Sequence, residues 1–315
     1  MKQFFAISSI RLQQAMSFLH QCARLARLNR LTGFFLTFLP AYWGLVAGWH
    51  DFAANNSNFT LQGSKGGLYF VIILLGALLA RSAGCVLNDI ADIEFDKKTA
   101  RAINRPLACG TLTKKHAIYL VAFIAVLGLG LICFLPLNAA IVCLASLPLI
   151  AIYPYTKRFN PLPQLFLGAV FNLGLFVGYM CLNPVLQNKS LFLLYTAALC
   201  WTFIYDTIYA TQDMEDDIKN GAFSSVITLG SKLYQVMYIV FAICLLCIFS
   251  FGVLNQYCQV YYLLAGAGWL VGLACIILVQ FGKMSAFWFF ELSTIFCIFI
   301  AVAITKAKSC FMLIL

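Results

Sequence analysis

Long apolar runs, separated by short polar or Pro/Gly-containing breaks, dominate the pattern of this 315-residue chain. A helix that crosses a membrane needs about 20 mostly apolar residues. The pattern therefore predicts an all-α, polytopic membrane protein. We expect its nine transmembrane helices at 31–49, 68–87, 117–135, 138–152, 164–182, 191–209, 233–253, 260–281 and 285–305.

The breaks between these runs leave no room for a soluble domain, so 31–315 is expected to form one transmembrane domain. Residues 1–30 form a separate basic segment with five basic and no acidic side chains. A mitochondrial presequence has a similar composition, but no long cleavable stretch precedes the first run, which favours a retained segment. Its apolar residues could build an amphipathic helix at the membrane interface: Phe4, Phe5, Ile7, Ile10, Leu12 and Phe18.

Composition supports the membrane class and sets the orientation. With 63% hydrophobic and only 10% charged residues, and a mean hydropathy of +0.90, the chain falls outside the soluble globular class. Sixteen of the 21 basic residues fall on one membrane face, four fall on the other, and Arg81 lies within a span. Positive residues mark the cytoplasmic side. We therefore expect the N-terminus and the acid-rich loops in the cytoplasm. Because basic residues that flank spans account for the net charge of +10, this charge does not indicate a nucleic-acid partner.

The cysteines and histidines predict no metal site. The thirteen cysteines are scattered along apolar stretches, and the single CxxC, Cys244 to Cys247, has no second pair near it. We interpret them as small core residues. The three histidines are too far apart in sequence to suggest a zinc site.

Acidic residues are concentrated in two short windows. Nine of the eleven Asp and Glu residues lie there, although a charge near the bilayer costs at least a few kcal/mol. Each window follows the end of a predicted span, and its spacing places the acids along one helical stripe. The first window contains Asp89, Asp92, Glu94 and Asp96, and the second contains Asp206, Asp213, Glu215, Asp216 and Asp217.

Two clusters of oxygen ligands suit a hard cation such as Mg²⁺, which binds through one or two carboxylates while a substrate phosphate supplies further oxygens. Arginine and lysine side chains, the usual partners of a diphosphate, stand nearby. A solvated, charge-mixed loop would explain one such window, but two windows on one predicted face favour a binding site. The basic residues concerned are Lys97, Lys98, Arg101, Arg105, Lys157, Arg158 and Lys219.

These motifs resemble the paired signature of the UbiA superfamily of intramembrane aromatic prenyltransferases. The resemblance rests on Asn88-Asp-x-x-Asp92-x-x-x-Asp96 and on Asp213-x-x-x-Asp217. Within the superfamily, the chain most resembles the 4-hydroxybenzoate polyprenyltransferase branch. Further matching residues are Arg27, Gly33, Pro40, Trp43, Arg101, Asn104-Arg105-Pro106-Leu107, Tyr153-x-x-x-Lys157, Pro163-Gln164, Leu167-Gly168 and Tyr205-Asp206-Thr207-x-Tyr209-Ala210. The departures are Asn29, Leu31 and Ala222-Phe223-Ser224-Ser225.

The resemblance implies nine helices around a central cavity with lateral access from the bilayer. It also implies Mg²⁺-dependent transfer of a polyprenyl group from polyprenyl diphosphate to 4-hydroxybenzoate, ortho to the hydroxyl, as a step of ubiquinone biosynthesis. The bacterial inner membrane is the expected location, with the mitochondrial inner membrane as the alternative. No obligate protein partner is implied. The implied metal ligands are Asn88, Asp92, Asp96, Asp213 and Asp217, and the implied diphosphate ligands are Arg101, Arg105, Tyr153 and Lys157.

The acceptor needs a group that orients or deprotonates its hydroxyl and a cation for its carboxylate. Asp213 is the first candidate for the former because the metal motif includes it, and Asp206 is the second. Arg158 is the first candidate for the carboxylate, with Arg81 or Arg30 next. Aromatic side chains would shield an allylic cation.

Two alternatives stay open. A prenyltransferase of this superfamily could use a haem, menaquinone or chlorophyll-type acceptor. A secondary transporter is the alternative from another class, but transporters place ionisable residues near the midplane on interrupted helices. Here the acids sit at the ends of spans, and the two halves of the chain show no clear repeat.

Overall fold

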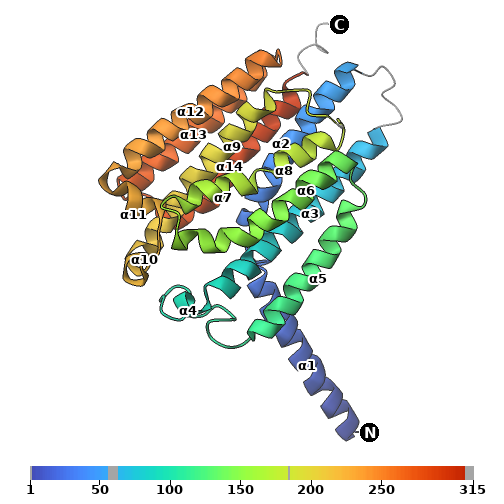
Figure 1. The fold of residues 1–315 in the computed structure, drawn as a ribbon, viewed down its shortest axis with the longest axis vertical. Coiled ribbons are helices and arrows are strands. Elements are labelled where there is room, and N and C mark those ends of the chain that lie inside the picture. Colours follow the sequence, from blue (N-terminus) through green and yellow to red (C-terminus); the bar gives the residue numbers. More distant parts are fainter. Residues whose placement is uncertain (1, 56–62, 184, 309–315) are drawn as a thin grey trace.

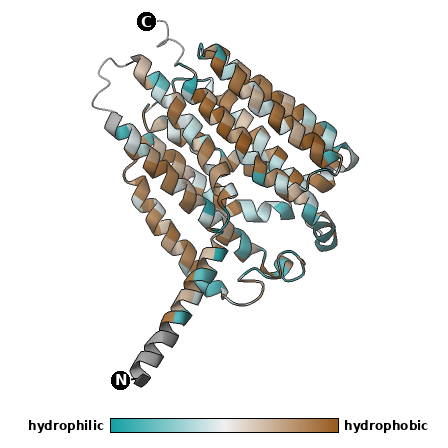
Figure 2. Cartoon of the chain, turned by 180° about the vertical axis from the view of Figure 1, so that it is seen from behind, coloured by the Kyte–Doolittle hydropathy of each residue, from teal (hydrophilic) through white to brown (hydrophobic). Residues whose placement is uncertain are grey.

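The computed structural model describes residues 2–55, 63–183 and 185–308. Within these ranges the chain forms helices and no strand, and nine helical segments are long and apolar enough to cross a membrane. The predicted all-α class and the nine spans are confirmed. The spans pack into one bundle, and hydrophobic residues make up most of their length, whereas hydrophilic ones gather toward the ends (Figure 2).

The helices follow the predicted runs closely (Figure 1). They are α2 (Leu31–Asn55), α3 (Gly63–Ala91), α5 (Lys114–Ile132), α6 (Leu137–Ile152), α7 (Pro163–Phe171) with α8 (Gly174–Met180), α9 (Leu191–Ala210), α12 (Leu233–Leu254), α13 (Gln259–Gln280) and α14 (Ala286–Lys306). Short elements at the ends of spans are α4 (Ile93–Asp96), η1 (Tyr153–Arg158), η2 (Thr211–Asp213), α10 (Met214–Asn220), α11 (Ser225–Leu229) and η3 (Gly230–Lys232).

The N-terminal segment forms helix α1 (Lys2–Leu25), which extends away from the bundle at the end that carries α4 and α10 (Figure 1). Three of its apolar residues, Leu12, Met16 and Leu19, are exposed at helical spacing. Phe18 lies edge-on to His116 at the start of α5. The side chains of 1–11, which include most of the predicted apolar face, lie outside the described residues, so interfacial binding of α1 stays a prediction.

The fifth predicted span is interrupted, which the apolar pattern did not indicate. The break between α7 and α8 falls at Asn172, whose side chain is completely buried. Its Nδ2 donates to the carbonyl of Gly168 at 2.7 Å and to Oγ1 of Thr202 at 2.9 Å. An asparagine that hydrogen-bonds to nearby backbone groups competes with the regular helix, which explains the change of direction here.

Helix α2 lies at the centre and packs against α8, α3 and α14. Its crossing with α8 is so close that it requires glycine on both helices. A Cβ on Gly44 would lie 1.8 Å from the carbonyl oxygen of Leu175, and one on Gly178 would lie 2.0 Å from that of Ala41. Any side chain at either position would force the two backbones apart.

Two buried tryptophans attach α14 to the rest of the bundle. Trp43 of α2 donates its indole N–H to the carbonyl of Cys297 at 3.1 Å, and Trp201 of α9 donates to that of Ser293, also at 3.1 Å. Trp201 further contacts the ring of Phe296 with centroids 4.5 Å apart. Because buried indole N–H groups need an acceptor, these bonds fix α14 relative to α2 and α9.

Candidate active site

The first acidic motif begins on a transmembrane helix and continues past its end. Helix α3 ends at Ala91, Asp92 leaves the helical conformation with φ −104° and ψ 9°, and α4 follows. The backbone bonds nevertheless continue, from Asp92 N–H to the carbonyl of Asn88 (3.0 Å) and from Asp96 N–H to that of Asp92 (2.8 Å). The predicted stripe is therefore kept, although the helix that carries it is not continuous.

The second motif has a similar build. Helix α9 ends at Ala210, the tighter turn of η2 leads to Asp213, and α10 carries Asp217. Gly221 ends α10 in the left-handed conformation, with φ 66°, which glycine adopts without a steric penalty. Asp213 and Asp217 thus project from the end of a span, as expected, across a local change of helix type.

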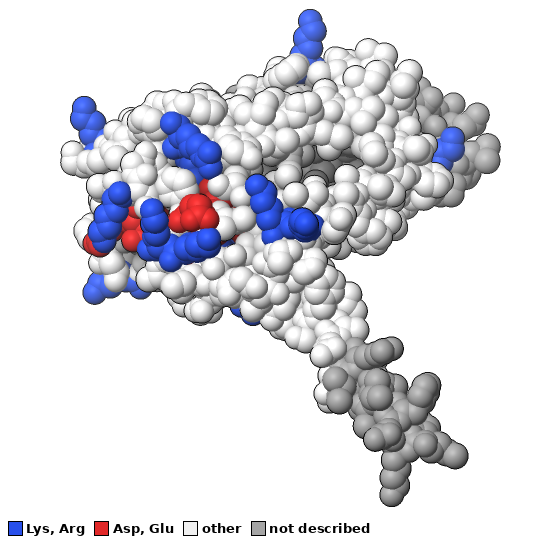
Figure 3. Space-filling model, turned by 60° about the horizontal axis from the view of Figure 1, so that its bottom comes forward, with Lys and Arg blue, Asp and Glu red and all other residues white. Residues whose placement is uncertain are grey.

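The two motifs meet at one end of the bundle. Figure 3 looks onto this end and shows a group of acidic side chains surrounded by lysines and arginines. Asp217 interacts electrostatically with Asp92 and with Lys157. Arg101, in the loop after α4, donates Nε to Oδ1 of Asp213 at 2.9 Å, and its Nη2 donates to the other oxygen of the same carboxylate. This arginine therefore connects the loop of the first motif to the second motif.

Residues expected to bind a diphosphate neutralise acids expected to bind the metal. Lys157 Nζ lies 2.6 Å from Asp92 Oδ2. Nη1 of Arg105 donates to both carboxylate oxygens of Asp96 at 2.8 Å and lies 3.3 Å from Oδ1 of Asp89. Such charge-assisted contacts are among the stronger hydrogen bonds of proteins. In each of these contacts a basic side chain is paired with an acid of the first motif.

Burial works against the charged forms of these acids. Asp92 and Asp96 are 3% and 7% exposed. Burial raises the pKa of Asp92 above its ordinary value and that of Asp96 to about 6, although Lys157 and Arg105 act in the opposite direction. A further cation near these carboxylates would therefore stabilise their ionised forms.

The oxygen atoms of the first motif suit a hard cation. Oδ1 of Asp92 and Oδ2 of Asp89 are buried and have no hydrogen-bond partner within the described part of the chain, which is costly unless another group binds them. Nδ2 of Asn88 donates a hydrogen bond to Oδ2 of Asp92 at 3.2 Å. The amide oxygen of Asn88 takes no part in that bond. No three His, Cys, Asp or Glu side chains of the described ranges come close enough to form a metal site alone. Mg²⁺ prefers oxygen ligands and completes its shell with water and substrate phosphate, so the oxygen atoms of this motif are of the type that it binds.

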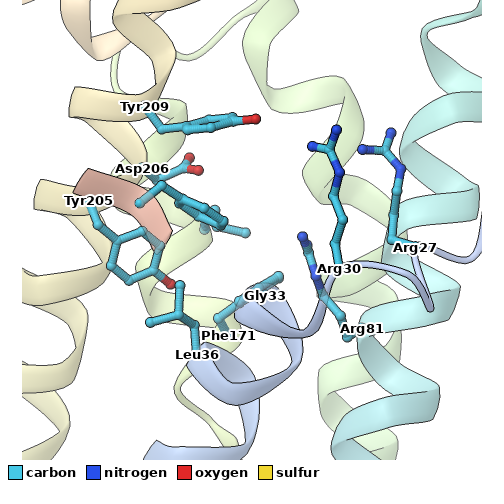
Figure 4. A pocket seen from close by; sticks show the side chains of 11 residues that line it. Arg27, Arg30, Gly33, Leu36, Arg81, Phe171, Tyr205, Asp206 and Tyr209 are labelled. Atoms are coloured by element: carbon cyan, nitrogen blue, oxygen red, sulfur yellow. The ribbon is translucent and has the colours of Figure 1, made fainter. Parts of the chain in front are cut away.

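A pocket lies beside the two motifs (Figure 4). Arg27, Arg30 and Arg81 stand on one side of it, and α9 supplies polar groups to the other. Its floor is apolar or aromatic. The residues of α9 are Tyr205, Asp206 and Tyr209, and the other lining residues are Gly33, Leu36, Leu167, Phe171 and Phe290.

Polar contacts join this pocket to the acidic motifs. Nη2 of Arg27 donates to Oδ1 of Asp89 at 2.8 Å. Arg101 donates to the hydroxyl of Tyr209 at 2.6 Å and lies over its ring, 4.9 Å from the centroid. Arg81 interacts electrostatically with Asp206. A ligand in the pocket would therefore lie next to the site expected to bind the diphosphate.

Arg158, the first candidate for binding a carboxylate, does not line this pocket. Its Nη2 donates to the carbonyl of Ala91 at 2.9 Å, and its guanidinium lies 5.0 Å from the ring centroid of Tyr155. The pocket instead contains both second candidates, Arg81 and Arg30. The signal that distinguishes Arg81 is its position as a cation inside an apolar span, where charges need a reason.

Other pocket residues had no distinguishing signal in the sequence. Phe171 is one of 29 phenylalanines, and nothing in its neighbourhood marks it. Phe290 likewise lies in an apolar run that predicts only a span.

Tyr153, expected to bind diphosphate, lies in η1 together with Lys157.

Comparisons with known proteins agree with this architecture. The sequence profile of the UbiA prenyltransferase family matches residues 37–296. A 4-hydroxybenzoate octaprenyltransferase of Francisella tularensis subsp. novicida (strain U112) is 35% identical over 195 residues, which cover 62% of this chain and 68% of that protein. A mitochondrial 4-hydroxybenzoate polyprenyltransferase of Caenorhabditis elegans is 39% identical over 209 residues, or 66% of this chain and 56% of that protein.

Solved structures share the fold. A UbiA homologue from Aeropyrum pernix K1, without ligand, superposes with a TM-score of 0.69 at 23% identity, covering 90% of this chain and 99% of that one. A UbiA homologue from Archaeoglobus fulgidus, bound to GPP and Mg²⁺, gives a TM-score of 0.64 at 16% identity, covering 91% of this chain and 99% of that one. The arrangement of helices around the site is thus that of these proteins.

Proposed function

Because the chain belongs to the UbiA prenyltransferase family, we propose that it transfers a polyprenyl group from polyprenyl diphosphate to the ring of 4-hydroxybenzoate, ortho to the hydroxyl, with Mg²⁺ as cofactor. The observation that carries this proposal is the pocket in which Arg81 stands opposite Asp206, next to both acidic motifs (Figure 4). An arginine for a carboxylate and an acid for a hydroxyl suit the two ends of 4-hydroxybenzoate. The names of two relatives, from Francisella and Caenorhabditis, support the same acceptor.

The donor side follows from the ion pairs of the two motifs. Asn88, Asp92, Asp96, Asp213 and Asp217 would hold Mg²⁺, which supplies positive charge beside the leaving diphosphate when it is bound. If these carboxylates held a metal ion, the basic side chains that are paired with them would be available to bind phosphate oxygens. Arginine forks and the lysine ammonium suit this exchange. The side chains proposed to bind diphosphate are Arg101, Arg105, Tyr153 and Lys157.

The chemical step breaks the bond between the allylic carbon and the diphosphate oxygen, which keeps the electron pair. Positive charge spreads over the allyl unit as that bond breaks. The rings of Tyr205, Tyr209 and Phe290 line the pocket, and those of Tyr209 and Phe290 lie 4.7 Å apart between centroids. Aromatic faces attract such a cation, and they also exclude water that would otherwise capture it.

The acceptor ring forms the new carbon–carbon bond and then loses the proton of the attacked carbon. Its nucleophilicity rises when a base accepts the proton of its hydroxyl. Asp206 lines the pocket, where it can reach the hydroxyl of an acceptor, whereas both oxygens of Asp213 accept hydrogen bonds from Arg101. We therefore place Asp206 at the hydroxyl and Arg81 at the carboxylate, with Arg30 as a second cation.

The remaining parts of the proposal concern the cell. We place the reaction in ubiquinone biosynthesis and the protein in the bacterial inner membrane, with the site facing the cytoplasm. The excess of basic residues at the end of the bundle that carries the site supports this orientation. The bilayer would hold the polyprenyl tail of the donor.

Turnover by the purified protein tests the proposal. The protein, reconstituted in lipid nanodiscs, is supplied with geranyl diphosphate, Mg²⁺ and one acceptor at a time: 4-hydroxybenzoate, or a haem, menaquinone or chlorophyll-type acceptor. We expect prenylated 4-hydroxybenzoate, and no product when the metal is removed by chelation. Product from another acceptor alone would refute the choice of acceptor, and no product from any acceptor would favour the transporter alternative.

Two arginine variants distinguish the candidate carboxylate ligands. Arg81→Ala should raise the KM for 4-hydroxybenzoate by about 10-fold or more, because a charge-assisted hydrogen bond contributes about 1.5–3 kcal/mol. Arg158→Ala is the matched comparison, since its guanidinium contacts a backbone carbonyl and Tyr155 instead. The opposite pattern of KM values would assign the carboxylate to Arg158.

A further inference from the structure

Gly33 occupies a helical position that glycine does not normally favour. It lies in the first turn of α2, and it also lines the pocket. Within a helix, glycine is less favourable than alanine by up to about 1 kcal/mol. Its use at this position therefore calls for a reason in the surroundings of the helix.

The surroundings show such a reason, because the guanidinium of Arg81 lies directly against the backbone of α2. A Cβ built on Gly33 would lie 2.5 Å from both Nε and Nη2 of Arg81 and 2.8 Å from its central carbon. Cβ atoms in folded proteins essentially never lie closer than 3.0 Å to another non-bonded heavy atom. No other group is as near to that position, so the space that a side chain would fill is occupied by this one cation.

The Arg81 guanidinium contacts an aromatic ring, and one of its hydrogen-bond donors is not used by any described residue. Its central carbon lies 5.8 Å from the ring centroid of Phe171, which contributes a cation–π attraction. Nε of Arg81 is buried and has no hydrogen-bond partner among the described residues. A buried donor without a partner is costly, and it lies at the wall of the pocket (Figure 4).

We propose that Gly33 is a positioning residue, which lets the Arg81 guanidinium lie against α2 so that it can receive the carboxylate of the acceptor. This inference rests on the proposed function, since it assigns the geometry of the same pocket. Gly33 has no side chain that could bind the acceptor, so it acts only through Arg81. A side chain at this position would move the cation into or away from the pocket and spoil its alignment with the carboxylate.

The substitution Gly33→Ala is expected to displace the cation and leave the fold intact. The atoms that the new methyl group would meet belong to the end of a flexible side chain. By contrast, a methyl group at Gly44 would meet the backbone of α8 at 1.8 Å and would disturb helix packing. Gly84 is the matched control on α3, because a Cβ there has nothing within 4 Å.

The experiment measures KM and kcat for 4-hydroxybenzoate and for 4-hydroxybenzamide, which keeps the hydroxyl but lacks the charge. Geranyl diphosphate and Mg²⁺ are saturating, and Kd by calorimetry replaces KM where turnover is slow. For Gly33→Ala we expect a KM for the benzoate about 10- to 100-fold higher. The KM for the amide should change less than about twofold. Gly84→Ala should match the wild type throughout.

A double variant separates positioning from packing. In an Arg81→Ala background, Gly33→Ala should have no further effect on the KM for the benzoate, because the residue through which it acts is gone. Equal losses for benzoate and amide, a persistent effect without Arg81, or an unchanged KM for the benzoate would each overturn the inference.

The proposed function fails separately. If the wild-type protein uses or binds the benzoate no better than the amide, the choice of a carboxylate acceptor is wrong, and the role of Gly33 is wrong with it. If the wild type prefers the benzoate and Gly33→Ala keeps that preference, only the role of Gly33 is refuted.

Discussion

The ion pair between Lys157 and Asp92 leads to the sharpest prediction for the ligand-free protein. Replacing Lys157 with methionine keeps the length of the side chain and removes its charge. Asp92 is 4% exposed and Lys157 is 25% exposed at the side chain, and the other oxygen of Asp92 has no partner. The variant would leave a buried carboxylate with neither oxygen bound to a cation.

The size of the effect lies between two known limits. Removing one partner of a fully buried pair costs about 3–5 kcal/mol, and exposed pairs contribute about 0–1 kcal/mol. The lysine is one-quarter exposed, and protonation of Asp92 would relieve part of the cost. We therefore expect Lys157→Met to lower the free energy of unfolding by about 2 kcal/mol at neutral pH without Mg²⁺.

Thermal unfolding in detergent or nanodiscs, followed by tryptophan fluorescence, measures this change. Without diphosphate, the variant should also bind Mg²⁺ about 10-fold more tightly than the wild type, because the lysine no longer competes for Asp92. Its affinity for the prenyl diphosphate should fall. Lys97→Met is the control, since the pair of Lys97 with Glu94 is exposed on both sides. The reasoning is refuted if Lys157→Met melts and binds Mg²⁺ like the wild type.

Three further predictions follow from the structure. Asp217→Asn should abolish Mg²⁺-dependent turnover with membrane insertion unchanged; retained activity would remove Asp217 from the metal site. Folding raises the pKa of Asp96 from 3.8 to about 6, so its carboxylate is available only above that pH, and its ionisation lowers stability as the pH rises through this range. Mg²⁺ affinity, titrated calorimetrically, should therefore fall below about pH 6, and a pH-independent affinity would contradict this. Trp201→Phe, which loses the bond to Ser293 but keeps a ring, should lower thermal stability by about 1 kcal/mol; no change would show that this bond contributes nothing.

The membrane-spanning architecture could be predicted from the sequence because the bilayer dictates the length and polarity of each span. The break at Asn172 could not, because one amide in an apolar run hardly changes hydropathy. Its effect comes from the hydrogen bonds that its amide donates, one to the carbonyl of Gly168 and one to Thr202 on a neighbouring helix. The interruption at Asp92 was missed for a similar reason, since the spacing of the acids is the same in a continuous helix and in this distorted one.

The acidic motifs could be predicted because charges are rare in so apolar a chain. Their ion pairs with lysines and arginines depend on which loops meet in space. These pairs could not be predicted, because the sequence does not show which loops meet. Arg158 was the first candidate for the acceptor carboxylate, and nothing in the sequence shows that Arg81 and Arg30 line the pocket whereas Arg158 does not. The close approach to Gly33, which decides its position, is a property of two helices packed together.

The attachment of α14 to α2 has a consequence for biosynthesis. Trp43 and its acceptor on Cys297 are separated by 254 positions along the chain, and Thr32 at the start of α2 is hydrogen-bonded to Glu291. Helix α2 therefore completes this packing only when α14, which is synthesised much later, has been inserted. Contacts this distant in sequence form slowly. Until α14 is inserted, the indole N–H of Trp43 lacks the acceptor that it has in the folded bundle.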